Sequence, residues 1–176
     1  MPTVQFQTIL FIPSAGAKIG SGKILHLPKN ASAELPTRGL NMVTGTMNGL
    51  RFRAPLEPDG EGSHWFKVDD ELCSALGIEV GDSVTVEVEP AKVWPEPPVP
   101  SDLLAAVELN ARAHAAWTDI TTMARWDWVR WFESVKLPET QRERPAKLCS
   151  MLAAGKRRPC CFNRAMRTHP RSATPL

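Results

Sequence analysis

Cysteine and long apolar runs are scarce in this chain of 176 residues. Its four cysteines are too few to hold a disulfide scaffold together. No stretch approaches the roughly 18–20 consecutive apolar residues that span a bilayer, which argues against an integral membrane protein. The first residues lack a basic stretch, and Gln5, Gln7 and Thr8 interrupt the apolar pattern that follows. We therefore expect no signal peptide and a cytoplasmic location.

The sequence signatures of common enzymes are also missing. We find no phosphate-binding loop, no HExxH, no GxSxG and no glycine-rich dinucleotide motif. His26 and His114 have no acidic or nucleophilic companion close by in the sequence, so each is expected to be structural or solvated. We therefore expect a chain that is not an enzyme, with no cofactor and no metal.

Charge is distributed unevenly along a composition that is otherwise typical of globular proteins, with 43% hydrophobic and 23% charged residues. Residues 1–100 carry eight Lys and Arg against twelve Asp and Glu, whereas residues 141–176 carry nine against one. A basic tail on an acidic body is compatible with contact to nucleic acid, anionic lipid or an acidic partner. We favour the simpler interpretation, in which the tail folds back on the acidic body.

Residues 1–90 have the pattern of a small β-barrel domain. Apolar and polar residues alternate in several short runs, for example Val84, Val86 and Val88. Asn48-Gly49 separates two such runs and is the dipeptide best suited to a type I′ hairpin turn. One short helix is expected at Asp69–Leu76, where acidic residues come first and Gly77 follows the end.

The remaining chain is predicted to contain a linker, a helical domain and a tail. Residues 90–100 contain five prolines, so residues 91–100 are expected to form a stiff linker without helix or central strand. In residues 101–155 the period changes to about 3.6, which indicates helices. Residues 156–176 form the basic tail, and its end is expected to be disordered.

Three or four helices are expected in the second domain. Ser101 is predicted to cap a helix that runs to about Asn110, and Ala111–Ile120 are expected either to continue it or to form a second short helix. A further helix is expected over Thr121–Lys136, with Trp128, Trp131, Phe132 and Val135 on its core face. Trp126 lies on the opposite side of that helix, where docking on another element is the favoured interpretation. A last helix is expected between Pro145 and Gly155.

Four residues of the barrel are candidates for ligand binding. Arg51 and Arg53 are two apart on one predicted strand, so their side chains point to the same face. His64 and Trp65 follow on the next strand. Two guanidinium groups near an imidazole and an indole suit a small anionic or planar ligand. A plain polar outer face is the alternative, and the sequence leaves both open.

Cys160 and Cys161 stand among Arg157, Arg158 and Arg164. Nearby positive charge lowers the pKa of a thiol, so redox sensitivity is one interpretation. Ordinary reduced thiols are another. A metal site is a third, although the spacing to Cys149 and His169 matches no familiar zinc pattern.

Several strings taken together resemble a known family. They are VTGTMNGLRFRAPLEPDGEGSHWFKV, ALGIEVGDSVTVEVEP, VPSDL, VRWFESVKLPETQRER and LAAGKRRPCCF. In this order they resemble the bacterial YdeI/OmpD-associated (bacteriocin-protection) family, in which a small β-barrel domain of unknown function precedes a short helical domain. The resemblance covers about Thr3 to Phe162.

The resemblance implies an α+β fold whose barrel is of the double-split type, similar to AbrB/MazE-like barrels. It also implies tolerance to bacteriocins and other antimicrobial peptides, and it brings no catalytic residues. The chain departs from the family at Gln141, where the family has arginine, and at Pro145, where it has isoleucine. Pro145 predicts that the last helical stretch is interrupted.

The combined prediction is a non-catalytic binding or stress-protection protein. Its ligand surface would be the barrel face with Arg51, Arg53, His64 and Trp65, and its partner a small anionic ligand or a protein. Two alternatives remain: a nucleic-acid-binding protein that uses the barrel and the basic tail, which we do not favour, and a thiol-redox protein that uses Cys160 and Cys161.

Overall fold

The chain folds into two compact units in a computed structural model that describes residues 2–14, 22–135 and 137–176. The first unit comprises Met1–Lys92 and Arg164–Leu176, and the second comprises Val93–Asn163. The sequence placed residues 156–176 together in one tail. In the structure, residues 164–176 instead return to the first unit, and we call them the return segment.

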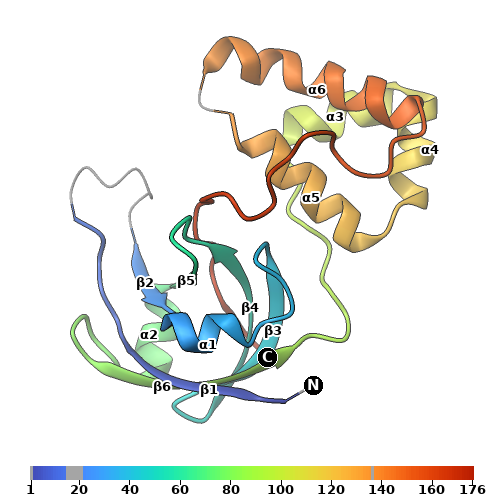
Figure 1. Ribbon diagram of the computed structural model, residues 1–176. Helices are drawn as coiled ribbons and strands as arrows, with labels where there is room; N and C mark the ends of the chain where they lie inside the picture. The colour runs from blue at the N-terminus through green and yellow to red at the C-terminus, as the bar shows by residue number, and fades with distance from the viewer. Residues whose placement is uncertain (1, 15–21, 136) are drawn as a thin grey trace. The chain divides into compact units, whose positions relative to one another are not determined.

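The first unit is a curled antiparallel sheet, so the predicted α+β class is confirmed (Figure 1). The strand order along the sheet is β1-β6-β3-β4-β5-β2. Phe11, just beyond β1, forms an antiparallel bridge with Ile24 of β2, so the two ends of the sheet curl toward each other as a half-barrel. The strands are β1 (Val4–Ile9), β2 (Lys23–His26), β3 (Asn41–Met47), β4 (Leu50–Pro58), β5 (His64–Val68) and β6 (Ser83–Pro90).

Local sequence signals account for the turns and helices of this unit. Asn48 and Gly49 have φ angles of 44° and 86°, as a type I′ turn requires, and they join β3 to β4 in the predicted hairpin. Helix α1 spans Lys29–Ala33, and α2 spans Asp70–Leu76. Gly77 ends α2 in the left-handed conformation, as the sequence predicted.

Alternating side chains of the strands fill the core of the first unit. Val84, Val86 and Val88 of β6 are each fully buried, whereas Glu87 and Glu89 between and beyond them are exposed. Phe52 of β4 and Phe66 of β5 stack inside the curl with their ring centroids 5.8 Å apart. The period of two read from the sequence therefore separates the inner and outer faces as expected.

The second unit contains four helices among its described residues: α3 (Ser101–Leu109), α4 (Ala111–Asp119), α5 (Thr122–Glu133) and α6 (Pro138–Ala153). Three residues of the predicted stripe on α5, Trp128, Trp131 and Phe132, lie in its core. Lys136, the predicted end of that helix, lies outside the described residues. Trp126 is buried and donates from Nε1 to the carbonyl oxygen of Pro95 at 2.7 Å, which agrees with the docking interpretation.

Two expectations for the helices differ from the structure. Pro145 lies inside the continuous helix α6, which starts with Pro138 in its first turn. A proline costs an internal helix one hydrogen bond, and here the surrounding helix persists. Ser101 is the first residue of α3 rather than its cap, and no side chain caps that helix.

The proline-rich residues Val93–Pro100, expected to form a linker, belong to the second unit.

Candidate functional site

Strands β4 and β5 diverge soon after they meet. They pair only through Glu57↔Trp65 and Pro58↔His64. The rest of β4 pairs on its other edge with β3, from Met47↔Leu50 to Asn41↔Leu56. A gap therefore opens between the unpaired edge of β4 and the end of β5.

The return segment fills this gap as an extended strand. Its short strand β7 (Thr174–Pro175) runs antiparallel to β4, with Arg53 opposite Thr174. Ser172 forms a parallel bridge with Lys67 of β5. The backbone amide of Lys67 donates to the carbonyl of Arg171, and the amide of Ala173 donates to that of Lys67, both at 2.8 Å. Main-chain hydrogen bonds thus connect the segment to both strands.

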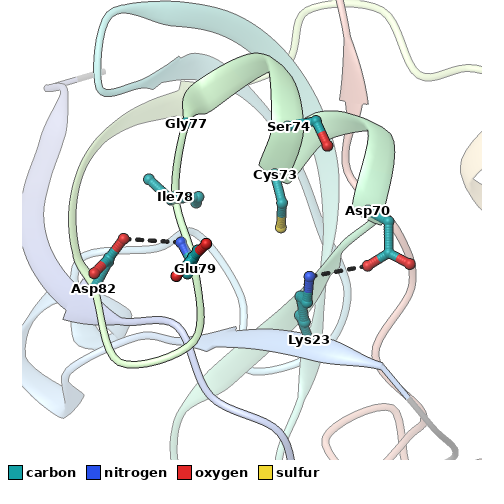
Figure 2. A pocket seen from close by; sticks show the side chains of 8 residues that line it. All are labelled: Lys23, Asp70, Cys73, Ser74, Gly77, Ile78, Glu79 and Asp82. Carbon is teal, nitrogen blue, oxygen red and sulfur yellow. Dashed lines mark hydrogen bonds and ion pairs between the residues drawn. The ribbon is translucent and has the colours of Figure 1, made fainter.

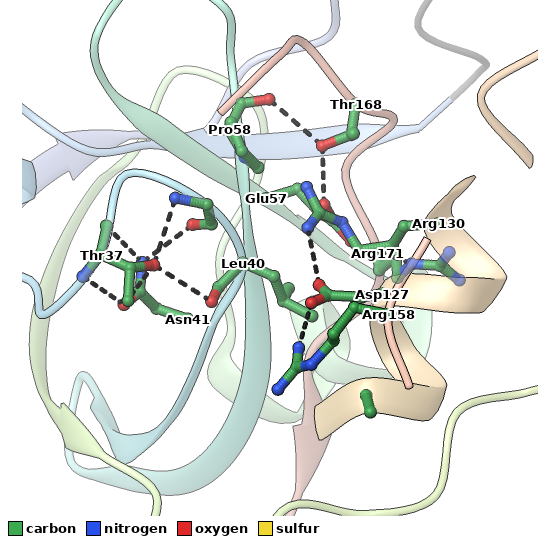
Figure 3. Close-up of polar contacts among 12 residues, drawn as sticks. Thr37, Leu40, Asn41, Glu57, Pro58, Asp127, Arg130, Arg158, Thr168 and Arg171 are labelled. Carbon is green, nitrogen blue, oxygen red and sulfur yellow. Dashed lines mark hydrogen bonds and ion pairs between the residues drawn. The ribbon is translucent and has the colours of Figure 1, made fainter. Parts of the chain in front are cut away.

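Glu57 holds the return segment by its side chain. The residue is only 1% exposed, and its carboxylate accepts a hydrogen bond from Arg171 Nε at 3.0 Å and from Thr168 Oγ1 at 2.6 Å (Figure 3). A buried carboxylate is strongly unfavourable unless it is paired and hydrogen-bonded. Glu57 is therefore a site that accepts a guanidinium and a hydroxyl group from an extended chain.

Trp65 forms a second wall against the return segment. Its indole Nε1 donates to the carbonyl oxygen of Thr168 at 3.0 Å. The guanidinium of Arg167 lies 5.0 Å from the indole centroid, within the range of a cation–π interaction. The indole is almost completely buried, so it contributes apolar area as well as a donor.

Asp59 and His26 form a hydrogen-bonded pair beside this wall. His26 Nε2 lies 2.6 Å from the carboxylate of Asp59, and the His26 ring meets Trp65 edge-on with centroids 6.3 Å apart. Burial acts to raise the pKa of Asp59. Hydrogen bonds from His26 and from the backbone amides of Glu61 and Ser63 outweigh burial, and the net pKa is lowered.

The structure gathers three of the four predicted ligand residues, in roles that the sequence did not predict. Trp65 binds the return segment with its indole. Arg51 and Arg53 touch it through their backbone, since the carbonyl of Arg51 accepts from the amide of Leu176 at 3.1 Å. Their side chains are at least partly exposed, and along β4 they lie about 20 Å (Arg51) and about 13 Å (Arg53) from the level of Glu57. The four residues therefore do not form one surface for an anion.

His64 is the predicted residue that the structure removes from the surface. It is 1% exposed, and Ser32 Oγ lies 2.7 Å from its Nδ1. Nε2 donates to the carbonyl of Gly39 at 2.8 Å, so Nδ1 accepts the hydroxyl proton of Ser32. Burial, opposed by the hydrogen bond to Gly39 and assisted by nearby Arg38, lowers the pKa of His64. Ser32 and His64 are both buried, so their hydrogen bond lies inside the fold.

Cys160 and Cys161 are exposed in the second unit, with their sulfur atoms 3.2 Å apart. The expected lowering of the thiol pKa is not found at Cys161, where the hydrogen bond and charge of Cys160 raise it. Two neighbouring arginines are occupied elsewhere: Arg157 pairs with Asp119 at 2.6 Å, and Arg158 pairs with Asp127. The redox interpretation therefore loses the electrostatic support that the sequence suggested.

A separate pocket of about 550 Å³ lies beside α2 (Figure 2). Lys23 and Asp70 pair across it at 3.0 Å, and the Asp82 carboxylate accepts from the amide of Glu79 at 2.8 Å. Burial raises the pKa of the Cys73 thiol, which remains protonated at neutral pH. Asp70 and Asp82 are exposed and already have these partners, so we assign the pocket no ligand.

The described part of the chain contains neither a metal-ligating cluster nor a membrane-spanning helix. No group of three or more His, Cys, Asp and Glu there is arranged to hold a metal ion. Within the same residues, no helix combines the length and apolarity of a membrane span.

Sequence reasoning missed the residues that define the gap, Glu57, Thr168 and Arg171. One local signal was present: Glu57 is the single charged residue of the run Ala54–Pro58, and a charged side chain is unusual in such an apolar strand. Its partners are more than a hundred positions away, at separations of 111 and 114 residues. A single sequence gives no pattern from which such a distant pairing follows.

Two regions of the chain match described families. Residues 96–155 match the family OmdA, described as "Bacteriocin-protection, YdeI or OmpD-Associated". Residues 6–88 match DUF1905, a domain of unknown function. No curated protein matches the chain. The resemblance read from the sequence strings is thereby confirmed: residues 96–155 are similar to the bacteriocin-protection, YdeI or OmpD-associated family, and residues 6–88 are similar to DUF1905.

Proposed function

We propose that this protein protects against bacteriocins and related antimicrobial peptides by binding a peptide without altering it chemically. The observation that carries the proposal is the buried Glu57 carboxylate, which holds Arg171 and Thr168 of an extended chain segment. The first unit already binds its own return segment as an extended basic strand, and binding of a cationic peptide requires a surface of the same kind.

Charge supports the same ligand class. Residues 1–92 carry eight Lys and Arg against eleven Asp and Glu, whereas residues 164–176 carry three Arg and no acidic residue. The larger part of the first unit is therefore acidic and is complementary to a cationic peptide. The description of the family matched over residues 96–155 names bacteriocin protection, which agrees with such a ligand.

The test measures retention and integrity together. A synthetic cationic antimicrobial peptide is equilibrated by dialysis against the full-length protein. The concentration of free peptide is measured, and its molecular mass is determined by mass spectrometry. We expect the free concentration to fall while the peptide mass stays unchanged. A cleaved or modified peptide would mean that the protein is an enzyme, and an unchanged free concentration would mean that it does not bind.

We also propose a cytoplasmic location. All four cysteines are free thiols, including the two exposed sulfur atoms that lie 3.2 Å apart without a disulfide bond. Exposed neighbouring thiols of this kind persist most readily in a reducing compartment. Immunoblotting of fractionated cells tests this, since recovery from the periplasm would contradict it.

Nucleic-acid binding is the second candidate. It rests on the proposal that the half-barrel is of the double-split, AbrB/MazE-like type, which includes DNA-binding members, and on the basic residues after position 140. Three of those arginines are paired with Asp119, Asp127 and Glu57, which reduces the charge available for phosphates. Titration of duplex DNA at low salt distinguishes the two functions, because a peptide-retaining protein is expected to show no measurable binding.

A further inference from the structure

The gap between β4 and β5 lies inside a range matched by a family, whereas the segment that fills it does not. Glu57, Trp65 and Lys67, which line the gap, lie within residues 6–88. The return segment lies outside both matched ranges. The receiving surface thus lies within a matched range, while its occupant lies outside both.

The return segment is mostly exposed, and its strand pairing is short. Of its thirteen residues, only Pro170 and Ala173 are buried. Its strand β7 is two residues long, and it pairs with β4 at only two positions. Short edge pairings of this size are weak by themselves. The segment therefore lies largely on the surface of the first unit, with Ala173 in the main core and Pro170 also buried.

We propose that this gap is an exchangeable peptide-binding site, in which an extended cationic peptide takes the place of the return segment. The proposal rests on the proposed function, since it names where and how the retained peptide binds. The return segment acts as an internal competitor that keeps the edges of β4 and β5 covered until a ligand arrives.

The contacts of the return segment specify the ligand. Glu57 requires a hydroxyl and a guanidinium, which Thr168 and Arg171 supply three residues apart. Ala173 is 2% exposed within the main core, so the position two residues after the arginine must be small. The preferred peptide is therefore extended and carries Ser or Thr, then Arg three residues later, then a small residue two further on.

Competition from within the chain sets the affinity that a free peptide reaches. A tethered segment acts at an effective concentration on the order of millimolar, so it masks the site from a weaker free ligand. Loosening the segment therefore raises the apparent affinity for an added peptide, whereas fixing it in place abolishes binding.

The experiment uses the full-length protein and a fluorescent peptide with the sequence of residues 164–176, RAMRTHPRSATPL. Fluorescence anisotropy is measured with the wild type and with Thr168→Ala/Arg171→Ala, which removes both internal contacts to Glu57. We expect the double variant to bind the peptide about tenfold more tightly or better. A peptide in which the arginine equivalent to Arg171 is alanine should bind at least about tenfold more weakly.

A reversible lock provides the matched control. Arg53→Cys and Thr174→Cys replace two directly opposed residues, in a Cys160→Ser/Cys161→Ser background that removes the native exposed thiols. Oxidation should fix the return segment and abolish peptide binding, and reductant should restore it in the same sample. Since only the lock changes between the two states, loss of folding is excluded as a cause.

The outcomes separate the inference from the proposed function. If the affinity for the fluorescent peptide is changed neither by the lock nor by Thr168→Ala/Arg171→Ala, the proposed exchange site is wrong. If the wild type still retains the cationic antimicrobial peptide in dialysis, the proposed function stands without it. A dimer that grows with the concentration of the loosened variant would assign the gap to a second copy of the chain, and would also overturn the proposal.

Discussion

His64 shows how burial decides the chemistry of a single side chain. A histidine that donates to the Gly39 carbonyl and accepts from Ser32 has no need of a positive charge, and its burial lowers its pKa below 6.5. The unfolded chain takes up a proton near the ordinary value, and the folded chain does not. Stability contributed by neutral His64 is therefore complete above about pH 6.5 and is lost as the pH falls below it.

We expect the first unit to lose stability between pH 7 and pH 5.5, because His64 is protonated more readily in the unfolded chain. His64→Gln should lower the free energy of unfolding at pH 7 by about 1–3 kcal/mol, because Ser32 and the Gly39 carbonyl lose their buried hydrogen-bond partner. It should also flatten this pH dependence. Urea denaturation, monitored by hydrogen exchange of residues 41–58, measures the stability at pH 7 and its pH dependence. His114→Gln, at an exposed helical position, should keep the wild-type slope. Equal slopes in wild type and His64→Gln would contradict this account.

Cys161 provides a second prediction for a single residue. The hydrogen bond and charge of Cys160 raise its pKa, so less thiolate is present at neutral pH than in a free cysteine. We expect Cys161 to react with iodoacetamide no faster than glutathione at pH 7, measured by peptide mass spectrometry in a Cys160→Ser variant and in the wild type. Removal of Cys160 should increase the rate. A much faster reaction in the wild type would restore the redox interpretation.

Secondary-structure elements with local signals were predictable, and elements that depend on distant partners were not. The hairpin follows from Asn48-Gly49, and α2 follows from acidic residues before Gly77. The return segment contains Pro170 and Pro175 and has no periodic pattern. Its strand exists because β4 and β5 leave an open edge, which is a property of the fold and not of residues 164–176.

The attachment of the return segment depends on Ala173. Ala173→Asp would place an unpaired carboxylate in the core of the first unit, so we expect the segment to detach. Limited trypsin digestion should then cut after Arg167 and Arg171 at least about tenfold faster than in the wild type. Thr174→Asp, one position further and exposed, is the control and should digest at the wild-type rate. Equal digestion of both variants would contradict the anchoring role.

Helix caps in the second unit allow a paired test. Thr121 Oγ1 accepts from the amide of Ala124 at 3.1 Å and caps α5, whereas Ser101 makes no capping bond at α3. Thr121→Ala should lower the free energy of unfolding by about 1 kcal/mol, and Ser101→Ala should change it by less than about 0.5 kcal/mol. Urea denaturation monitored by tryptophan fluorescence compares them. A larger loss in Ser101→Ala would mean that the sequence-based assignment of the cap was correct.

Across the whole molecule, charge explains why a segment after the helical unit belongs to the first unit. The excess of three acidic residues over positions 1–92 is matched by the three arginines of residues 164–176. The sequence already indicated that a basic tail would fold back on an acidic body. It did not indicate Glu57 as the partner, and it assigned ligand binding to Arg51, Arg53, His64 and Trp65 as outward side chains. His64 is buried, and the two arginines contribute their backbone.

Hydrogen exchange of the full-length protein, with and without an added cationic peptide of the sequence of residues 164–176 in excess, tests the central claim most directly. The added peptide is synthesised with heavy carbon and nitrogen isotopes, so its mass distinguishes it from the return segment of the chain. We expect residues 164–176 of the chain to exchange faster when the peptide is present, while β4 and β5 remain protected because the peptide replaces the lost strand. Unchanged protection of residues 164–176 at saturating peptide, or protection gained only in the second unit, would contradict an exchangeable strand site between β4 and β5.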